Sequence, residues 1–138
     1  GVAAFADHRE LIGKVDAVSV VVPTGLHRQV ATDFLTNGVD VLVEKPIAPT
    51  VADGNALVEL AKQHGRILQV GHVERFNPAL RAIGSIGQSA RYIESHRLAP
   101  FTFRSTDIGV VLDLMIHDLD LVLALVQSPI RSVEAFGG

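Results

Sequence analysis

Three short apolar runs, rich in β-branched residues, mark the first half of the chain. They occupy residues 15–23 (VDAVSVVVP), 39–43 (VDVLV) and 66–71 (RILQVG). Continuous apolar runs of this length are typical of strands that are covered on both faces, as in a parallel sheet. The sequence therefore predicts three parallel strands in this part of the chain.

Two segments with helical spacing separate these runs. Residues 24–38 and 50–65 carry apolar side chains every three or four positions, and each begins with a threonine and ends with a glycine. We expect Thr24 and Thr50 to cap the two helices, Thr50 in a capping box with Asp53, and the glycines to end them in the left-handed conformation. Strand–helix–strand units of this length are right-handed, which predicts an α/β fold with a parallel sheet.

The pattern changes after Gly71, and we expect a second domain over residues 74–138. Residues 90–98 (ARYIESHRL) alternate like a half-exposed strand, residues 110–128 predict a long apolar helix, and residues 131–136 predict another strand. Strands of this kind favour an antiparallel or mixed sheet.

Composition narrows the classes of function. The 138 residues are 48% hydrophobic, carry a net charge of −3 and include no cysteine. Disulfides, thiolate zinc sites and cysteine nucleophiles are therefore excluded, and no basic cluster suggests a nucleic-acid partner. No apolar run reaches the roughly 18 residues of a membrane span, and the N-terminus lacks a signal-peptide pattern. We expect a cytoplasmic globular protein.

Glu44, Lys45 and Pro46 follow directly after the second apolar run. Ligands of doubly wound sheets bind beyond the carboxyl ends of the strands, so Lys45 lies where a ligand would bind. A partly desolvated lysine has a lowered pKa and can exchange a proton with a substrate hydroxyl. The alternative is an edge lysine that pairs with Glu44 and does no chemistry. We also expect a cis Lys45–Pro46 bond, because cis prolines are kept in turns beside sites.

Asp113, His117 and Asp120 lie on one face of the apolar helix predicted over residues 110–128. Buried ionisable groups need partners, and three interpretations stay open. Asp113 and His117 form an ordinary satisfied pair, or they face a cleft as an acid/base or substrate-binding pair. In the third interpretation they bind a metal that His72 or Glu44 completes. Spacing places no third ligand, so no metal is assigned.

Other polar residues follow the first and third runs. His27, in the first turn of a predicted helix, is either an exposed helix-start residue or one that borders the same sheet edge as Lys45. At the end of the third run, Arg75 can hold an anion or simply pair with Glu74. The candidates for substrate binding at this strand end are His72, Glu74, Arg75 and Asn77.

Four stretches follow one another in a characteristic order: VVVPTGLH (20–27), VLVEKPIAPT (41–50), LQVGHVERFNP (68–78) and VVLDLMIHDLD (110–120). In motif and spacing the chain resembles the glucose–fructose oxidoreductase / inositol dehydrogenase (Gfo/Idh/MocA) family over nearly its whole length. Glu-Lys-Pro after a strand is the most specific motif of the resemblance. The stretch GHVERFNP further resembles the branch that oxidises the 3-position of UDP-N-acetylglucosamine.

The resemblance implies a fold and an activity. The fold is the C-terminal half of a Rossmann-type parallel sheet over residues 1–73, followed over residues 74–138 by the start of an α+β domain with a mostly antiparallel sheet. The activity is that of a homo-oligomeric dehydrogenase that uses NAD or NADP to oxidise a hydroxyl of a sugar, nucleotide sugar or polyol. The implied proton-handling pair is Lys45 and His117, with Asp113 positioning substrate or His117. The implied cofactor-binding residues are Pro23, Thr24, His27, Glu44 and Lys45.

The chain departs from the family at its start. It has no G-x-G-x-x-G turn for the pyrophosphate, and residues 1–13 resemble the family's third strand and the helix after it. We therefore expect an internal fragment of a longer enzyme, inactive alone and binding NAD(P) weakly or not at all. The uncharged run 17–22 (AVSVVV) is expected at a sheet edge, where it would pair with a second copy.

Two alternatives to the dehydrogenase remain. The first is a non-catalytic binding or assembly module on the same fold, and the second is a metal-assisted hydrolase. The presence together of Lys45, Asp113 and His117 favours the dehydrogenase, because a binding module needs none of the three.

Overall fold

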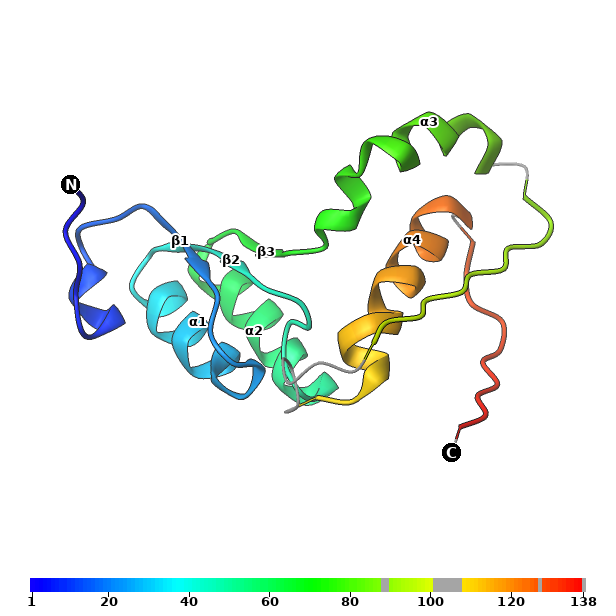
Figure 1. Cartoon of the computed structure of the whole chain (residues 1–138). Coiled ribbons are helices and arrows are strands. Elements are labelled where there is room, and N and C mark those ends of the chain that lie inside the picture. The colour runs from blue at the N-terminus through cyan, green and yellow to red at the C-terminus, as the bar shows by residue number, and fades with distance from the viewer. Residues whose placement is uncertain (88–89, 101–107, 127, 138) are drawn as a thin grey trace.

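The computed structural model describes residues 1–87, 90–100, 108–126 and 128–137 of the chain, with the side chains of residues 83–89 outside this description. Three strands alternate with helices in the first half, and helices joined by irregular segments make up the second (Figure 1). In chain order the elements are η1 (His8–Leu11), β1 (Ala17–Val20), η2 (Thr24–Leu26), α1 (His27–Thr36), β2 (Asp40–Val43), α2 (Val51–His64), β3 (Leu68–Val70), η3 (Val73–Phe76), α3 (Pro78–Gly87), η4 (Val111–Met115) and α4 (Ile116–Val126).

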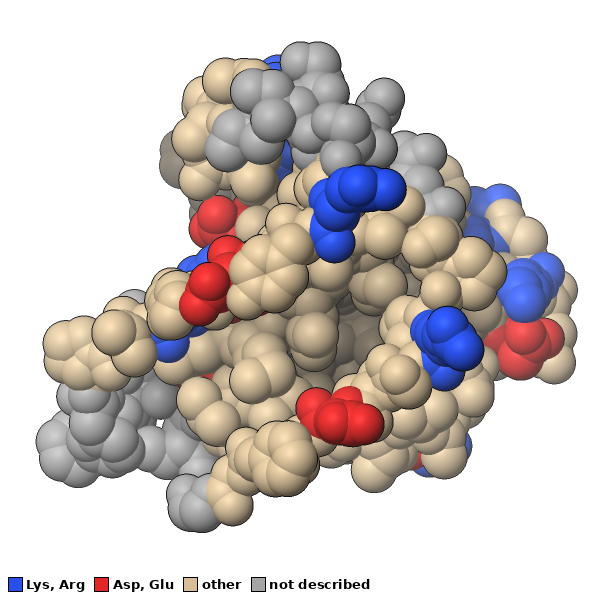
Figure 2. All heavy atoms as spheres, turned by 90° about the vertical axis from the view of Figure 1, so that its right-hand side faces the viewer, with Lys and Arg blue, Asp and Glu red and all other residues tan. Residues whose placement is uncertain are grey.

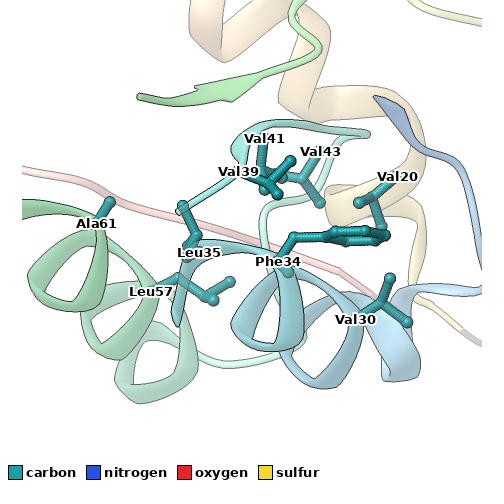
Figure 3. Close-up of a cluster of buried hydrophobic side chains, with 10 residues drawn as sticks. Val20, Val30, Phe34, Leu35, Val39, Val41, Val43, Leu57 and Ala61 are labelled. Carbon is teal, nitrogen blue, oxygen red and sulfur yellow. The ribbon is translucent and has the colours of Figure 1, made fainter. Parts of the chain in front are cut away.

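The strands form one parallel sheet in the order β1-β2-β3, as the sequence predicts. Helices α1 and α2 lie side by side against one face of this sheet (Figure 1). Phe34 and Leu35 of α1 and Leu57 of α2 pack against Val41 and Val43 of β2 (Figure 3). Burying side chains of this size stabilises the fold by about 1.5–3 kcal/mol each.

The opposite face of the sheet is open within the described part of the chain. Ser19 and Gln69 are exposed on it, and the side chain of Leu42 is 41% exposed. Val21 and Ile67, at the strand ends, are 69% and 65% exposed. The expectation of strands covered on both faces therefore differs from the structure. A continuous apolar run shows that a strand can be buried on two sides, but it does not show which covering elements are present.

The helix ends follow the predicted chemistry with two exceptions, which are the capping box of Thr50 with Asp53 and the cap at Thr24. In the first, the Asp53 carboxylate accepts the Thr50 hydroxyl at 2.8 Å, so the Thr50 half of the box is formed without the other half. Thr50 caps α2 by accepting the amide of Asp53 at 3.1 Å, and Gly65 ends this helix in the left-handed conformation at φ 59°. Gly38 has a positive φ of 79° after α1. Thr24 is not a cap, because the chain enters α1 through the 3-10 turn η2 and the side chain of Thr24 is buried there.

Residues 90–100 and 128–137 form no strand, although the sequence predicts one over residues 90–98, from their alternation, and another over residues 131–136. Alternating side chains describe a backbone that can pair, but a strand exists only where a neighbouring strand supplies the hydrogen bonds. Neither segment has such a neighbour among the described residues, so the predicted antiparallel sheet does not form there. The second half of the structure is instead built on η3, α3 and α4, which contact one another.

The long apolar helix predicted over residues 110–128 is present in two parts. Its first turn, η4, is a π-helix, and the rest is the α-helix α4. In the part of the chain that the structure describes, no helix is long and apolar enough to cross a membrane.

Candidate active site

Lys45 stands at the carboxyl end of the central strand. The ladder continues past β2, because the Glu44 amide donates to the Val20 carbonyl at 3.1 Å and the Gly71 amide donates to the Val43 carbonyl at 2.8 Å. The Lys45–Pro46 bond is cis, as predicted. The three strand ends therefore lie together at one edge of the sheet, and Lys45 leaves this edge from its middle strand.

The amine of Lys45 reaches Asp113, which lies 68 positions further along the chain. Its Nζ donates to the Asp113 carboxylate at 2.9 Å and to the Asp113 carbonyl oxygen at 2.7 Å. The Lys45 side chain is 18% exposed and that of Asp113 26% exposed. This contact joins the sheet edge to η4, the π-helical turn that contains Asp113. The ion-pair partner of Lys45 is therefore Asp113 and not Glu44.

Asp113 lies within the π-helical turn η4, and His117 follows in the first turn of α4. The wider turn changes which side chains share a face, and π-helical turns often occur at functional sites. No sequence pattern predicts this turn. The Nδ1 atom of His117 is buried and has no hydrogen-bond partner among the described residues.

Burial of the His117 ring lowers its pKa below 6.5, and the positive charges of Lys45 and Arg97 lower it further. Lys45 and His117 are therefore close enough to interact electrostatically. The shift keeps the imidazole neutral at neutral pH, so that it can accept a proton from a ligand hydroxyl.

The end of β3 meets α4 through a second ion pair. Arg75 in η3 donates two hydrogen bonds to the carboxylate of Asp120, one of them at 2.6 Å. Asp120 is 8% exposed, and its hydrogen bonds with Arg75 lower its pKa. His72 Nδ1 lies 3.9 Å from this carboxylate and is buried without a hydrogen-bond partner in the described structure. Arg75 therefore pairs with Asp120 rather than with Glu74.

Asn77 and Glu74 have local contacts. The side-chain oxygen of Asn77 accepts the Ala79 amide at 3.0 Å, which caps α3, and its side-chain amide donates to Glu74 at 3.3 Å. Of the four predicted substrate-binding residues, the structure thus places His72 next to the Asp120 carboxylate and uses Asn77 in a helix cap.

The residues after β1 differ in their access to solvent. Pro23 is exposed and Thr24 is buried. His27 is only 1% exposed, which excludes an exposed helix-start residue. Its two ring nitrogens lie 2.9 Å from the backbone carbonyl oxygens of Pro46 and Val22. His27 does border the same edge as Lys45, but from inside the fold.

Two further features escaped the sequence analysis. Gly71, at the end of β3, packs against the carboxylate of Glu44, which a Cβ at Gly71 would approach to 3.2 Å. Arg97 binds Asp118 of α4 through two hydrogen bonds of 2.8 and 3.0 Å and ties the irregular segment 90–100 to this helix. A glycine after a strand is a possible signal of close backbone approach, whereas no local pattern connects Arg97 with Asp118.

A cavity of about 360 Å³ lies between the start of α2 and the start of η4 and α4, and its lining includes His72 but not Lys45, Asp113 or His117. Its walls are mostly apolar, and they include Pro46, Pro49, Val58, Val70, His72 and Leu112. The face made by the second half of the chain is also hollowed, and the Lys, Arg, Asp and Glu side chains visible there stand around the hollow (Figure 2). Apolar walls with a few polar groups are typical of small-molecule sites. No group of three or more His, Asp or Glu side chains suited to a metal occurs in the described ranges.

Comparison with known proteins gives a consistent set of relatives. Residues 1–72 match the model of GFO_IDH_MocA, described as an oxidoreductase family with an NAD-binding Rossmann fold. The UDP-N-acetylglucosamine 3-dehydrogenase of Acidithiobacillus ferrooxidans is 43% identical over 135 residues, which are 97% of this chain and 43% of that protein. The scyllo-inositol 2-dehydrogenase (NAD(+)) of Bacillus subtilis is 33% identical over 132 residues, or 89% of this chain and 39% of that protein.

Solved structures agree with these relatives. A crystal form of the Acidithiobacillus ferrooxidans UDP-N-acetylglucosamine 3-dehydrogenase superposes with a TM-score of 0.83 at 42% identity, covering 91% of this chain and 42% of that one. An NAD-binding protein from Listeria innocua superposes with a TM-score of 0.74 at 26% identity, covering 90% and 40%. The chain spans about two fifths of the length of the curated relatives it matches.

Proposed function

The chain belongs to the Gfo/Idh/MocA oxidoreductase family, and we propose that it forms the nicotinamide-proximal part of a dehydrogenase that oxidises a hydroxyl of a nucleotide sugar, sugar or polyol. The observation that carries the proposal is the contact of 2.9 Å between Lys45 and Asp113. It brings the edge of the parallel sheet, where Rossmann folds bind their cofactor, against the helix that bears His117.

The residues around this contact suit the nicotinamide end of NAD or NADP. Glu44 and Lys45 follow the central strand, Pro23 is exposed at the end of the neighbouring strand, and His72 and His117 each have a buried Nδ1 without a partner in the described structure. When bound, the cofactor supplies a hydride acceptor. We propose that Thr24, which is buried beside this edge, also contributes to the site for the nicotinamide end of the cofactor.

The protein's own contribution is orientation and proton transfer. Asp113 holds the amine of Lys45 at two oxygen atoms, which fixes its direction. His117, neutral because burial lowers its pKa, can accept the hydroxyl proton, and the Lys45 ammonium can stabilise negative charge on the same oxygen. His72 and Glu74 are the proposed contacts for further substrate hydroxyls, and the Arg75–Asp120 pair positions α4.

Three further proposals concern the substrate class, the binding of NAD(P) and self-association. The substrate class follows from the relatives, of which one acts on UDP-N-acetylglucosamine and another on scyllo-inositol. The 138-residue chain, which has no Gly-rich pyrophosphate turn, should bind NAD(P) weakly. We also propose that it associates with copies of itself, because the edge of β1 is unpaired in the described structure.

The test is a dehydrogenase assay on the full-length gene product. Reduction of NAD+ and of NADP+ is followed with UDP-N-acetylglucosamine, scyllo-inositol and myo-inositol as substrates. We expect turnover with one substrate class. For Lys45→Met we expect kcat/KM to fall by about 10²–10⁴-fold, since this variant removes the charge and the proton of the side chain but nearly keeps its length.

Lys62→Met is the matched control, because Lys62 is an exposed lysine of α2 whose ion-pair partner in the described structure is Glu59. It should leave kcat/KM within about twofold of the wild type. Turnover that survives in Lys45→Met would disprove the proposed role of Lys45. A folded protein that binds a sugar nucleotide with no turnover under any condition would favour the non-catalytic binding module.

A further inference from the structure

His27 is buried in a position where both of its ring nitrogens face backbone carbonyl groups. Its Nδ1 lies 2.9 Å from the oxygen of Pro46, and its Nε2 lies 2.9 Å from the oxygen of Val22. The residue is 1% exposed, so water cannot replace either partner. These two contacts join the end of β1 to the residue that directly follows Lys45.

Carbonyl oxygens only accept hydrogen bonds. A neutral imidazole has one N–H donor and one nitrogen with a lone pair, so it can satisfy one of the two carbonyls and must repel the other. Only the doubly protonated ring donates at both ends. We propose that His27 donates from both ring nitrogens, as an imidazolium, and that it is thereby a positioning residue for Lys45.

The position of the bridge explains this role. Glu44 is already held to β1 by its backbone bond to Val20, but the chain beyond it leaves the sheet. The His27 ring fixes the carbonyl of Pro46 on the far side of Lys45, so Lys45 is held on both sides. Its amine can then meet Asp113 at 2.9 Å without first ordering the backbone. The part that Lys45 plays in catalysis rests on the function proposed above, whereas its placement by His27 does not.

The charged groups on the surrounding segments already have other partners. In the connection after β2, Glu44 accepts the Lys45 amide and Lys45 binds Asp113. On the helices, Arg28 of α1 is paired with Asp53 of α2. Within the described structure none of these side chains bonds to the His27 ring, so the two carbonyl oxygens are its hydrogen-bond partners. Hydrogen bonds from a charged donor are about twice as strong as neutral ones, which offsets part of the cost of burying a charged ring.

The protonation state can be measured directly on the 138-residue chain. Two-bond ¹⁵N–¹H correlation spectra of the histidine rings distinguish a protonated nitrogen from one with a lone pair. At neutral pH we expect both nitrogens of His27 to be protonated, and the exposed ring of His64 to serve as the internal reference. A lone-pair signal from either nitrogen of His27 would overturn the imidazolium.

The positioning role is tested by the accessibility of Lys45. Brief acylation followed by mass spectrometry reports on the three lysines, of which Lys45 is 18% and Lys62 66% exposed. In His27→Gln, which can donate from one nitrogen only, we expect acylation of Lys45 to rise severalfold with Lys14 and Lys62 unchanged. In the matched control His64→Gln no lysine should change.

The outcomes separate positioning from mere stabilisation and from the proposed function. A folded His27→Gln chain with wild-type acylation of Lys45 would show that His27 does not position it. A rise at all three lysines would likewise refute a specific effect on Lys45. If His27→Gln fails to fold, the ring spectra of the wild-type chain still decide the protonation state. Failure of the dehydrogenase assay leaves both of these measurements unaffected.

Discussion

At the scale of single residues, charge and burial around Lys45 determine the chemistry available to the site. The ammonium of Lys45 contacts Asp113 at 2.9 Å, and the same charge adds to the effect of burial in lowering the pKa of His117. One lysine therefore has two effects. It is held by a carboxylate, and it helps to keep a neighbouring imidazole neutral.

The protonation of His117 gives a prediction at this scale. Because burial lowers its pKa, the folded chain should titrate His117 below the ordinary value of 6.5, as followed by the ring proton and carbon shifts in NMR. Removing the positive charge in Lys45→Met should raise the pKa of His117 toward 6.5 while leaving the effect of burial. The exposed ring of His64 is the internal control.

The sign of the pH dependence follows from linkage. An imidazole whose pKa is lower in the folded state binds fewer protons there than in the unfolded chain, so its contribution to stability is present above pH 6.5 and is lost as the pH falls. An activity that depends on neutral His117 should fall on the acid side in the same direction. A titration midpoint of His117 at or above 6.5 would contradict this account.

At the scale of elements, two ion pairs hold the segments of the second half of the chain together. Arg75 connects η3 with α4 through Asp120, and Arg97 connects the segment 90–100 with α4 through Asp118. Both pairs hold the helix on which His117 lies. The geometry of the site therefore depends on contacts that lie outside it.

The Arg75–Asp120 pair gives the prediction at this scale. Arg75→Ala leaves the carboxylate of Asp120, 8% exposed, without its main donor. We expect the free energy of unfolding to fall by about 1–2 kcal/mol, the lower part of the range for a buried charge because Arg75 itself is half exposed. Urea unfolding monitored by circular dichroism measures it.

Arg28→Ala is the control, since Arg28 also pairs with a carboxylate but is 57% exposed. Its free energy of unfolding should fall by less than that of Arg75→Ala. The Asp120 pKa is lowered by Arg75, so the pair contributes stability above the ordinary carboxyl pKa of 3.8, and this contribution is lost as the pH falls through that value toward the lower pKa of the folded state. Equal stability losses in the two variants, or a loss for Arg75→Ala that is undiminished below pH 3, would argue against this role.

At the scale of the whole molecule, the sheet is covered on one side and at neither edge within the described structure. Helices α1 and α2 bury one face, whereas Val21, Leu42 and Ile67 are exposed on or beside the other. The edge strand β1 carries no charged side chain to discourage pairing. An open apolar edge of this kind favours association with another copy.

We therefore predict that the 138-residue chain self-associates at micromolar concentration. Val21→Lys, which puts a charge at the end of the open edge, should shift sedimentation velocity profiles toward the monomer. Val2→Lys is the matched control, because Val2 is 99% exposed and lies outside the sheet, and it should leave the profile unchanged. A wild-type chain that sediments as a single monomeric species at high concentration would disprove the prediction.

The sequence by itself determined the features that depend on neighbouring residues. The parallel strands, the Thr50 cap and the left-handed Gly38 and Gly65 each follow from local patterns, because strand periodicity, capping and backbone handedness are set within a few positions. The placement of Lys45 at a ligand-binding sheet edge followed from the same rule for parallel strands.

The family resemblance implied that Lys45, Asp113 and His117 act together, but only the tertiary structure decided which distant groups are in contact. The partner of Lys45 lies 68 positions away and that of Arg75 lies 45 away, and no local pattern encodes such pairings. The hydrogen-bond partners of the buried His27 ring come from two separate segments. Residues 90–98 alternate like a strand yet form none, because pairing requires a second strand in reach. Local conformation is fixed by short-range sterics, whereas burial, pKa and pairing depend on what the folded chain brings alongside each residue.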